Sequence, residues 1–200
     1  MIIKQKEIQT INQLQQLNTT DFQKIELTNN GTTPSKGMLA ETIKYAHEKQ
    51  LTVNTLIRPR QGKYDFNDIE IKIMEANIFE AQALGCDGIA FGAITEENKF
   101  DKDVLDQLIA AADGMQLILN HMVDKLNQVE KRRLIDFANE KEIDYMMITN
   151  DSTSSTFKEQ FQNLIDYNQG NIQFILCGDN EEQLLKDATY FNIHQILIEK

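Results

Sequence analysis

The stretch TLIRPRQGKY, Thr55 to Tyr64, joins an apolar run to a loop in which a proline stands between two arginines. Proline has no backbone N–H and cannot donate to a sheet ladder, so Pro59 is predicted to end a strand. That strand would deliver Arg58 and Arg60 to its carboxyl end. Because a guanidinium is planar and permanently charged, it suits a carboxylate or a phosphate. Two interpretations are open: Arg58 anchors an anionic ligand, or it pairs with a structural carboxylate while Arg60 is solvated.

Along the 200 residues, short apolar runs alternate with segments whose apolar residues recur at helical spacing. Strands are predicted to start near residues 2, 24, 51, 86, 116, 143, 172 and 195, with helices between them. Repeated strand–helix units are typical of a parallel sheet covered by helices, and eight units favour a TIM-type (β/α)8 barrel. An open doubly wound sheet is the alternative, although it usually has fewer strands. We therefore predict one compact α/β barrel domain over residues 1–200.

Helix-start signals support this division of the chain. Polar residues that can accept hydrogen bonds from free backbone N–H groups precede several of the helical stripes. They are Ser35, Asp101, the pair Asn67 and Glu70, the pair Asp179 and Glu182, and the Ser/Thr run 152–156.

The predicted barrel lacks its last helix, because the chain ends with the strand-like run HQILIEK, 194–200. The outer faces of the eighth and first strands would then be bare. Exposed apolar faces of this kind usually mark an interaction surface. We therefore expect a partner subunit or the first helix to cover them, and a homodimer is the simplest assembly.

Composition excludes several classes of partner. Hydrophobic content of 41% and charged content of 26% are ordinary for a soluble globular chain. Apolar runs fall short of the roughly 20 residues of a membrane span, so no membrane partner is expected. A net charge of −11 argues against nucleic acid, whose phosphates need clustered Lys and Arg. Two cysteines are too few for a disulfide scaffold, which indicates the reducing cytoplasm.

Polar residues stand where the predicted strands end, which is where barrels carry their chemistry. Glu26 lies between Ile25 and Leu27, and strand alternation therefore sends its side chain into the barrel. A buried carboxylate needs a cation or hydrogen-bond donors, and Arg58 is the predicted partner. We predict catalytic roles for Glu26, Arg58, His121 and Asp124, ligand binding by Arg60, Thr33 and Asn120, and metal binding by Cys177.

Three of these residues also have structural interpretations. His121, which ends the fifth strand, can be a hydrogen-bonded structural histidine. Asp124 can cap the following helix. Cys177, which ends the seventh strand, can be a small buried apolar side chain, because no Lys or Arg is near it in sequence.

Two motifs and their order resemble the CutC family of copper homeostasis proteins. A Glu-Leu pair stands shortly before a glycine and TPS, and IRPR-x-G follows with an aromatic and acidic tail. The matching residues are Glu26, Leu27, Gly31, Thr33, Pro34, Ser35, Ile57, Arg58, Pro59, Arg60, Gly62, Tyr64, Phe66 and Asp68. The resemblance implies a TIM-type barrel, a cytoplasmic location, self-association and a role in copper handling.

Copper is therefore the metal that the resemblance implies. Cu(I) favours thiolates and thioethers, and Cu(II) favours imidazoles. The sequence has no MxxM, CxxC or HxH spacing, and one possible grouping is His121, Met122 and Cys177. Family members carry a glutamate and cysteines in the first strand, where this chain has the run 4–6, KQK.

Two other functions stay open. The chain can be an enzyme or a binder acting on a small anion, a carboxylate or a phosphate, through Glu26, Arg58 and His121. It can also be a degenerate barrel with a scaffold role, because the first-strand residues of the family are missing.

Overall fold

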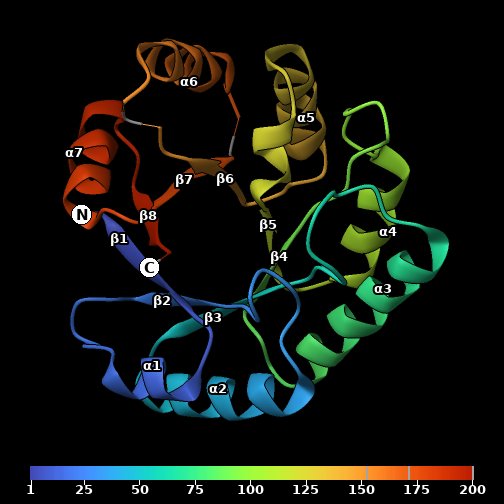
Figure 1. Ribbon diagram of the computed structural model, residues 1–200, viewed down its shortest axis with the longest axis vertical. Coiled ribbons are helices and arrows are strands. Elements are labelled where there is room, and N and C mark those ends of the chain that lie inside the picture. Colours follow the sequence, from blue (N-terminus) through green and yellow to red (C-terminus); the bar gives the residue numbers. More distant parts are fainter. Residues whose placement is uncertain (152, 171, 200) are drawn as a thin grey trace.

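Eight parallel strands pair in sequence order, and pairing of β8 with β1 closes the barrel that the sequence predicts (Figure 1). The computed structural model describes residues 1–151, 153–170 and 172–199. Closure excludes the open doubly wound sheet, because a closed barrel has no edge strands. The strands are β1 (Ile3–Ile8), β2 (Lys24–Leu27), β3 (Thr52–Leu56), β4 (Gly88–Phe91), β5 (Gln116–Leu119), β6 (Tyr145–Thr149), β7 (Gln173–Gly178) and β8 (Gln195–Ile198).

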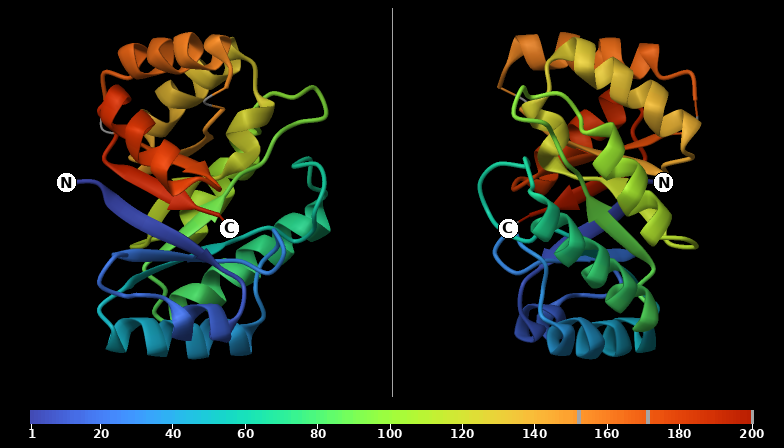
Figure 2. Two further views of the ribbon diagram at one scale, coloured as in Figure 1. Left: turned by 60° about the vertical axis from the view of Figure 1, so that its left-hand side comes forward. Right: turned by 90° about the vertical axis from the view of Figure 1, so that its right-hand side faces the viewer.

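The helices lie outside the strands (Figure 2). None of the helices in the described ranges is long and apolar enough to cross a membrane. Ser152, Asn171 and Lys200 lie outside the described residues, and so do the parts of the predicted segments that fall on them. The helices are α1 (Ile11–Gln16), α2 (Lys36–Glu48), α3 (Asp68–Ala83), α4 (Lys102–Ala111), the short 3₁₀ helix η1 (His121–Lys125), α5 (Gln128–Glu140), α6 (Ser155–Tyr167) and α7 (Glu181–Phe191).

Side-chain caps fix where the helices begin. The predicted caps Ser35 of α2 and Asp101 of α4 accept hydrogen bonds from the backbone three residues on. Asn67 and Glu70 form the predicted capping box of α3. The prediction for α7 is wrong by one residue, because Asn180 rather than Asp179 is its N-cap. Asparagine and aspartate cap equally well, so the sequence alone did not separate them.

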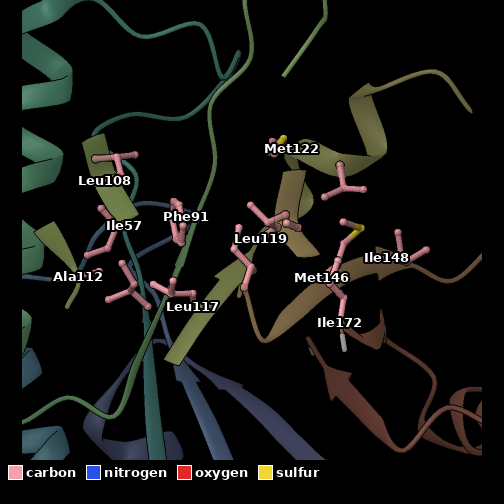
Figure 3. Packing of buried hydrophobic residues seen from close by; sticks show 14 of the residues in the cluster. Ile57, Phe91, Leu108, Ala112, Leu117, Leu119, Met122, Met146, Ile148 and Ile172 are labelled. Carbon is pink, nitrogen blue, oxygen red and sulfur yellow. The ribbon is translucent and has the colours of Figure 1, made fainter. Parts of the chain in front are cut away.

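Strand alternation produces two hydrophobic clusters. The outer one lies between strands and helices, and Figure 3 shows part of it around Phe91, Leu119 and Met146. Ile25 and Leu27 belong to this outer cluster, so Glu26 between them points into the barrel, as predicted. The inner cluster consists of Leu56, Ala90, Ile118, Met147, Ile175, Cys177 and Leu197.

Helices of the same chain contact the outer faces of β8 and β1. Ile196 and Ile198 of β8 are buried, and α7 packs against this strand. On β1, Lys4 Nζ lies 2.8 Å from Glu181 Oε1 at the start of α7. The first helix, α1, packs against β1, which is one of the two covers that the sequence predicted. Within the described residues, α7 and α1 therefore contact the outer sides of β8 and β1, while Lys4 and Lys6 of β1 stay part-buried.

Candidate functional site

Polar side chains from four neighbouring strands meet at the carboxyl end of the barrel. His121 follows β5, Thr149 ends β6, Cys177 lies near the end of β7, and Glu199 follows β8. A pocket of about 440 Å³ opens beside them, lined by Glu7, Gln9, Thr149, Asn150, Gly178, Asp179 and Glu199. This is the end of a TIM-type barrel where active sites are found.

His121 is held between two carboxylates. Its Nε2 lies 2.8 Å from Glu199 Oε1, and its Nδ1 lies 3.3 Å from Asp124 Oδ2. Burial lowers the pKa of His121, but the hydrogen bonds to Asp124 and Glu199 outweigh burial and raise this pKa to about 10. The ring is therefore an imidazolium at neutral pH, and it donates from both nitrogens.

Asp124 is part of this site rather than a helix cap. Thr149 Oγ1 donates to Asp124 Oδ2 over 2.6 Å, and the backbone N–H of Thr149 donates to Oδ1 over 3.3 Å. Burial favours a raised pKa of Asp124, but the hydrogen bonds from His121 and Thr149 hold it below its usual value. The caps of η1 and α5 are Asn120 and Asn127, so the alternative that Asp124 caps the following helix is wrong.

Asn120, a predicted ligand-binding residue, is almost completely buried. Its Oδ1 accepts a hydrogen bond from the backbone N–H of Met122. Its Nδ2 has no hydrogen-bond partner among the described residues. The capping role is thus established, while the ligand-binding role stays a prediction.

Glu26 is a buried acid without the predicted cation. It is 3% exposed, and no ion pair with Arg58 is found in the described parts of the chain. Burial raises the pKa of Glu26 to about 8, His121 opposes this rise, and Glu7 and Glu199 add to it. The prediction of a Glu26–Arg58 pair is therefore wrong, and Glu26 is largely protonated at neutral pH.

Arg58 hydrogen-bonds to loops around the carboxyl end of the barrel, which is called the mouth below. Its Nη1 donates to the Gly31 carbonyl over 3.3 Å, and its Nη2 donates to the Gly62 carbonyl. The guanidinium also lies 4.2 Å from the centroid of the Tyr64 ring. Neither interpretation of Arg58 predicted this arrangement, in which backbone carbonyls replace a carboxylate.

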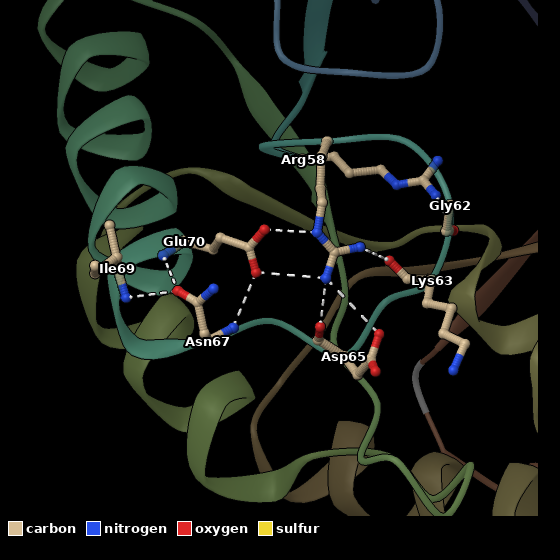
Figure 4. Close-up of polar contacts among 8 residues, drawn as sticks. Arg58, Gly62, Lys63, Asp65, Asn67, Ile69 and Glu70 are labelled. Carbon is tan, nitrogen blue, oxygen red and sulfur yellow. Dashed lines mark hydrogen bonds and ion pairs between the residues drawn. The ribbon is translucent and has the colours of Figure 1, made fainter.

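Arg60 forms an ion pair, and its side chain stays 39% exposed, so the interpretation that it is solvated holds only in part. It pairs with Glu70 of α3, and it donates to the carbonyls of Lys63 and Asp65 over 2.9 and 2.6 Å. Figure 4 labels these three partners. The hydrogen bond to Glu70 is the main cause of the raised pKa of Arg60. The side chain thus ties its own loop to the first turn of α3.

Thr33 joins the loop after β2 to the end of β3. Its Oγ1 accepts a hydrogen bond from the Arg58 backbone N–H over 2.8 Å and donates to the Arg58 carbonyl over 3.1 Å. The hydroxyl of this predicted ligand-binding residue is therefore already used within the protein.

Cys177 belongs to the inner cluster and is completely buried. Burial, with smaller contributions from Glu199 and Glu26, raises the pKa of its thiol well above the usual value. One ligand atom each of His121, Cys177 and Glu199 lies within 4.8 Å of the other two. These three residues are called the three-donor cluster below.

The three-donor cluster differs from the predicted grouping in one member. Met122 packs in the outer hydrophobic cluster (Figure 3). Cys177 lies in the inner one. Glu199 takes the place of Met122 in the cluster, and the sequence did not predict this residue. A signal was present, since Glu199 directly follows the last strand at the same end of the barrel as His121.

Comparisons with known proteins agree with the sequence resemblance. Residues 5–197 match the family model described as the CutC family. A CutC family protein from Enterococcus faecalis is 36% identical over 145 residues, which are 70% of this chain and 69% of the relative. A human copper homeostasis protein cutC homolog is 36% identical over 101 residues, 50% of this chain and 36% of the human protein.

Solved structures show the same fold. A CutC structure from Streptococcus agalactiae superposes with a TM-score of 0.92 at 25% identity and covers 98% of each chain. An HpcH/HpaI aldolase from Desulfitobacterium hafniense gives a TM-score of 0.67 at 7% identity over 100% of this chain and 86% of the aldolase. The second likeness shows the barrel architecture alone.

Proposed function

Because this chain belongs to the CutC family, we propose that it serves in copper homeostasis and holds copper at the mouth of its barrel. The relatives whose names include copper homeostasis support the role. The observation that carries the site is the convergence of the Cys177 thiol and the His121 imidazole within 4.8 Å, with the Glu199 carboxylate beside them.

The residues of the cluster fit copper. Cys177 would supply a thiolate and His121 an imidazole nitrogen, which are ligands that copper ions prefer. Asp124 hydrogen-bonds Nδ1 and thereby orients the ring so that Nε2 faces Glu199 and the cluster. Both ligands carry protons in the metal-free protein, so binding is expected to release protons.

Competition for Cu(I) with a chromogenic chelator under anaerobic conditions tests the site. The unaltered protein is expected to withdraw one equivalent of Cu(I), and Cys177→Ser is expected to lose this ability. Cys86→Ser is the matched control, because Cys86 is also buried and unpaired but precedes β4 at the opposite end of the barrel. Retention of Cu(I) by Cys177→Ser would reject the site.

Binding of a small anion is the second candidate function. Glu26 is a protonated acid that can donate a hydrogen bond, and the positive charge of His121 lies near it. Arg58 Nε is buried and has no hydrogen-bond partner among the described residues. Together these groups provide donors to a carboxylate or phosphate at the mouth.

Self-association and a cytoplasmic location are also proposed for this chain. The sequence resemblance implies both. Cys86 and Cys177 are both unpaired, which suits a reducing compartment.

A further inference from the structure

We propose that the three-donor cluster also binds a divalent ion of the zinc type, which takes Glu199 as its third ligand and keeps a fourth position open to the neighbouring pocket. This inference rests on the proposed metal-binding role of the cluster, but it assigns a second kind of ion and a different set of ligands.

The donor set favours a divalent ion. The cluster offers one sulfur, one nitrogen and one carboxylate oxygen. Zn²⁺ accepts all three donor types, whereas Cu(I) prefers sulfur and nitrogen and gains little from a carboxylate. Glu199 Oε1 already lies 2.8 Å from His121 Nε2, so the oxygen and the nitrogen can face one ion. Cu(I) would use Cys177 and His121, while Zn²⁺ would use Glu199 as well.

The charge of the cluster points the same way. A bound Cys177 thiolate and the Glu199 carboxylate carry two negative charges between them, and Cys177 is completely buried. A divalent ion neutralises both charges, whereas Cu(I) leaves one uncompensated. Buried charges are costly unless they are paired, and the whole chain is already strongly negative, at −11.

The surroundings of His121 match the outer shell of a zinc ligand. Asp124 Oδ2 lies 3.3 Å from Nδ1, on the side of the ring away from Glu199. Thr149 in turn donates to Asp124 over 2.6 Å and holds this carboxylate in place. A carboxylate on the far nitrogen fixes the tautomer and raises the basicity of a metal-binding histidine.

Three protein ligands leave room for a fourth. Structural zinc sites are closed by four protein ligands, whereas three ligands and an open position are typical of sites that bind water or a small molecule. Glu199 and Thr149 line the pocket of about 440 Å³, so a ligand in that pocket reaches the edge of the cluster. We therefore expect the fourth position to exchange with small molecules from solution.

Titration of the metal-free full chain with Co²⁺ and Zn²⁺ tests the inference. Co²⁺ reports on Zn²⁺ sites through visible absorption, and a thiolate-to-cobalt band shows that Cys177 is a ligand. One equivalent of Co²⁺ with that band is expected, displaced by Zn²⁺, and added imidazole should change the spectrum by entering the fourth position.

Glu199→Gln keeps the shape of the side chain and removes its charge. It is expected to weaken Co²⁺ and Zn²⁺ binding by at least about tenfold while Cu(I) competition stays unchanged. Glu7→Gln is the matched control, because Glu7 lines the same pocket outside the three-donor cluster. It should retain divalent binding, and thermal melting should confirm that both variants fold.

The outcomes separate the two proposals. Cu(I) binding without a thiolate-bearing Co²⁺ complex would overturn this inference and leave the copper site intact. Co²⁺ binding without Cu(I) binding would support the inference and reject the copper site. Equal Co²⁺ affinity of Glu199→Gln and the unaltered protein would also overturn it, because Glu199 would then not be a ligand.

Discussion

The pKa of Glu26 shows how strongly burial changes the ionisation of a single side chain. Its carboxyl group lies inside the barrel, and burial raises its pKa from 4.5 to about 8. The folded state therefore holds a proton that the unfolded state loses above about pH 4.5. Because the folded pKa is the higher one, this proton contributes to the free energy of unfolding. The contribution is complete below the unfolded pKa and is lost as the pH rises through about 8.

This titration predicts the behaviour of Glu26→Gln. The glutamine is neutral in both states, so between about pH 5 and pH 8 the unaltered protein should lose stability relative to the variant. The loss is expected to be up to about 1.4 kcal/mol per pH unit. Urea unfolding at several pH values measures it, with Glu96→Gln, an exposed position, as the control. A difference that does not change with pH would contradict the buried, protonated state.

At the scale of elements, the segment from β3 to α3 acts as one unit. Arg60 pairs with Glu70, and Glu70 also completes the capping box with Asn67 (Figure 4). Arg58 holds the Gly62 carbonyl and stacks on Tyr64, which is buried at the mouth. Burial raises the pKa of Tyr64, Arg58 lowers it, and Asp124 and Glu26 raise it further, so the phenol lies near these acidic groups. The two arginines thus hold the loop between β3 and α3 in place at the mouth.

The segment from β3 to α3 also contains the arginine that would bind a small anion. A phosphate or a carboxylate at the mouth is expected to use Arg58 rather than Arg60, because Arg60 is paired with Glu70. Phosphate or citrate is then expected to raise the melting temperature of the unaltered protein and of Arg60→Met, but not of Arg58→Met. An unchanged shift in Arg58→Met would reject anion binding through this residue.

For the whole molecule, the structure changes the basis on which a dimer is expected. The outward residues Ile196 and Ile198 of β8 are buried within the chain, while α3 exposes Ile69, Ile73 and Phe79. Exposed apolar side chains along one helix are candidates for an interface between subunits. Self-association is therefore expected to use α3.

Sedimentation measures the mass of the assembly in solution. The unaltered chain is expected to sediment with twice the mass of one chain, and Ile73→Glu should shift it towards the monomer. Ile196 is buried in the single chain, so Ile196→Val serves as a control that should leave the assembly unchanged. A monomeric unaltered protein at high concentration would contradict the proposed homodimer.

The sequence by itself determined the barrel and the end of it that carries the polar residues. Alternation placed Glu26 inside, and strand ends marked His121, Asp124 and Cys177, because apolar periodicity and turn chemistry are local properties of the chain. Family motifs added the expectation of copper.

Only the tertiary structure decided which of these side chains meet. Glu199 faces His121 because the strands form a closed ring, and the ends of β5 and β8 lie around the same mouth. Glu26 lacks the cation expected for it because Arg58 turns instead to carbonyls in two loops. Such pairings depend on strand register, barrel closure and loop paths, which bring together residues far apart in sequence and leave no trace in local periodicity.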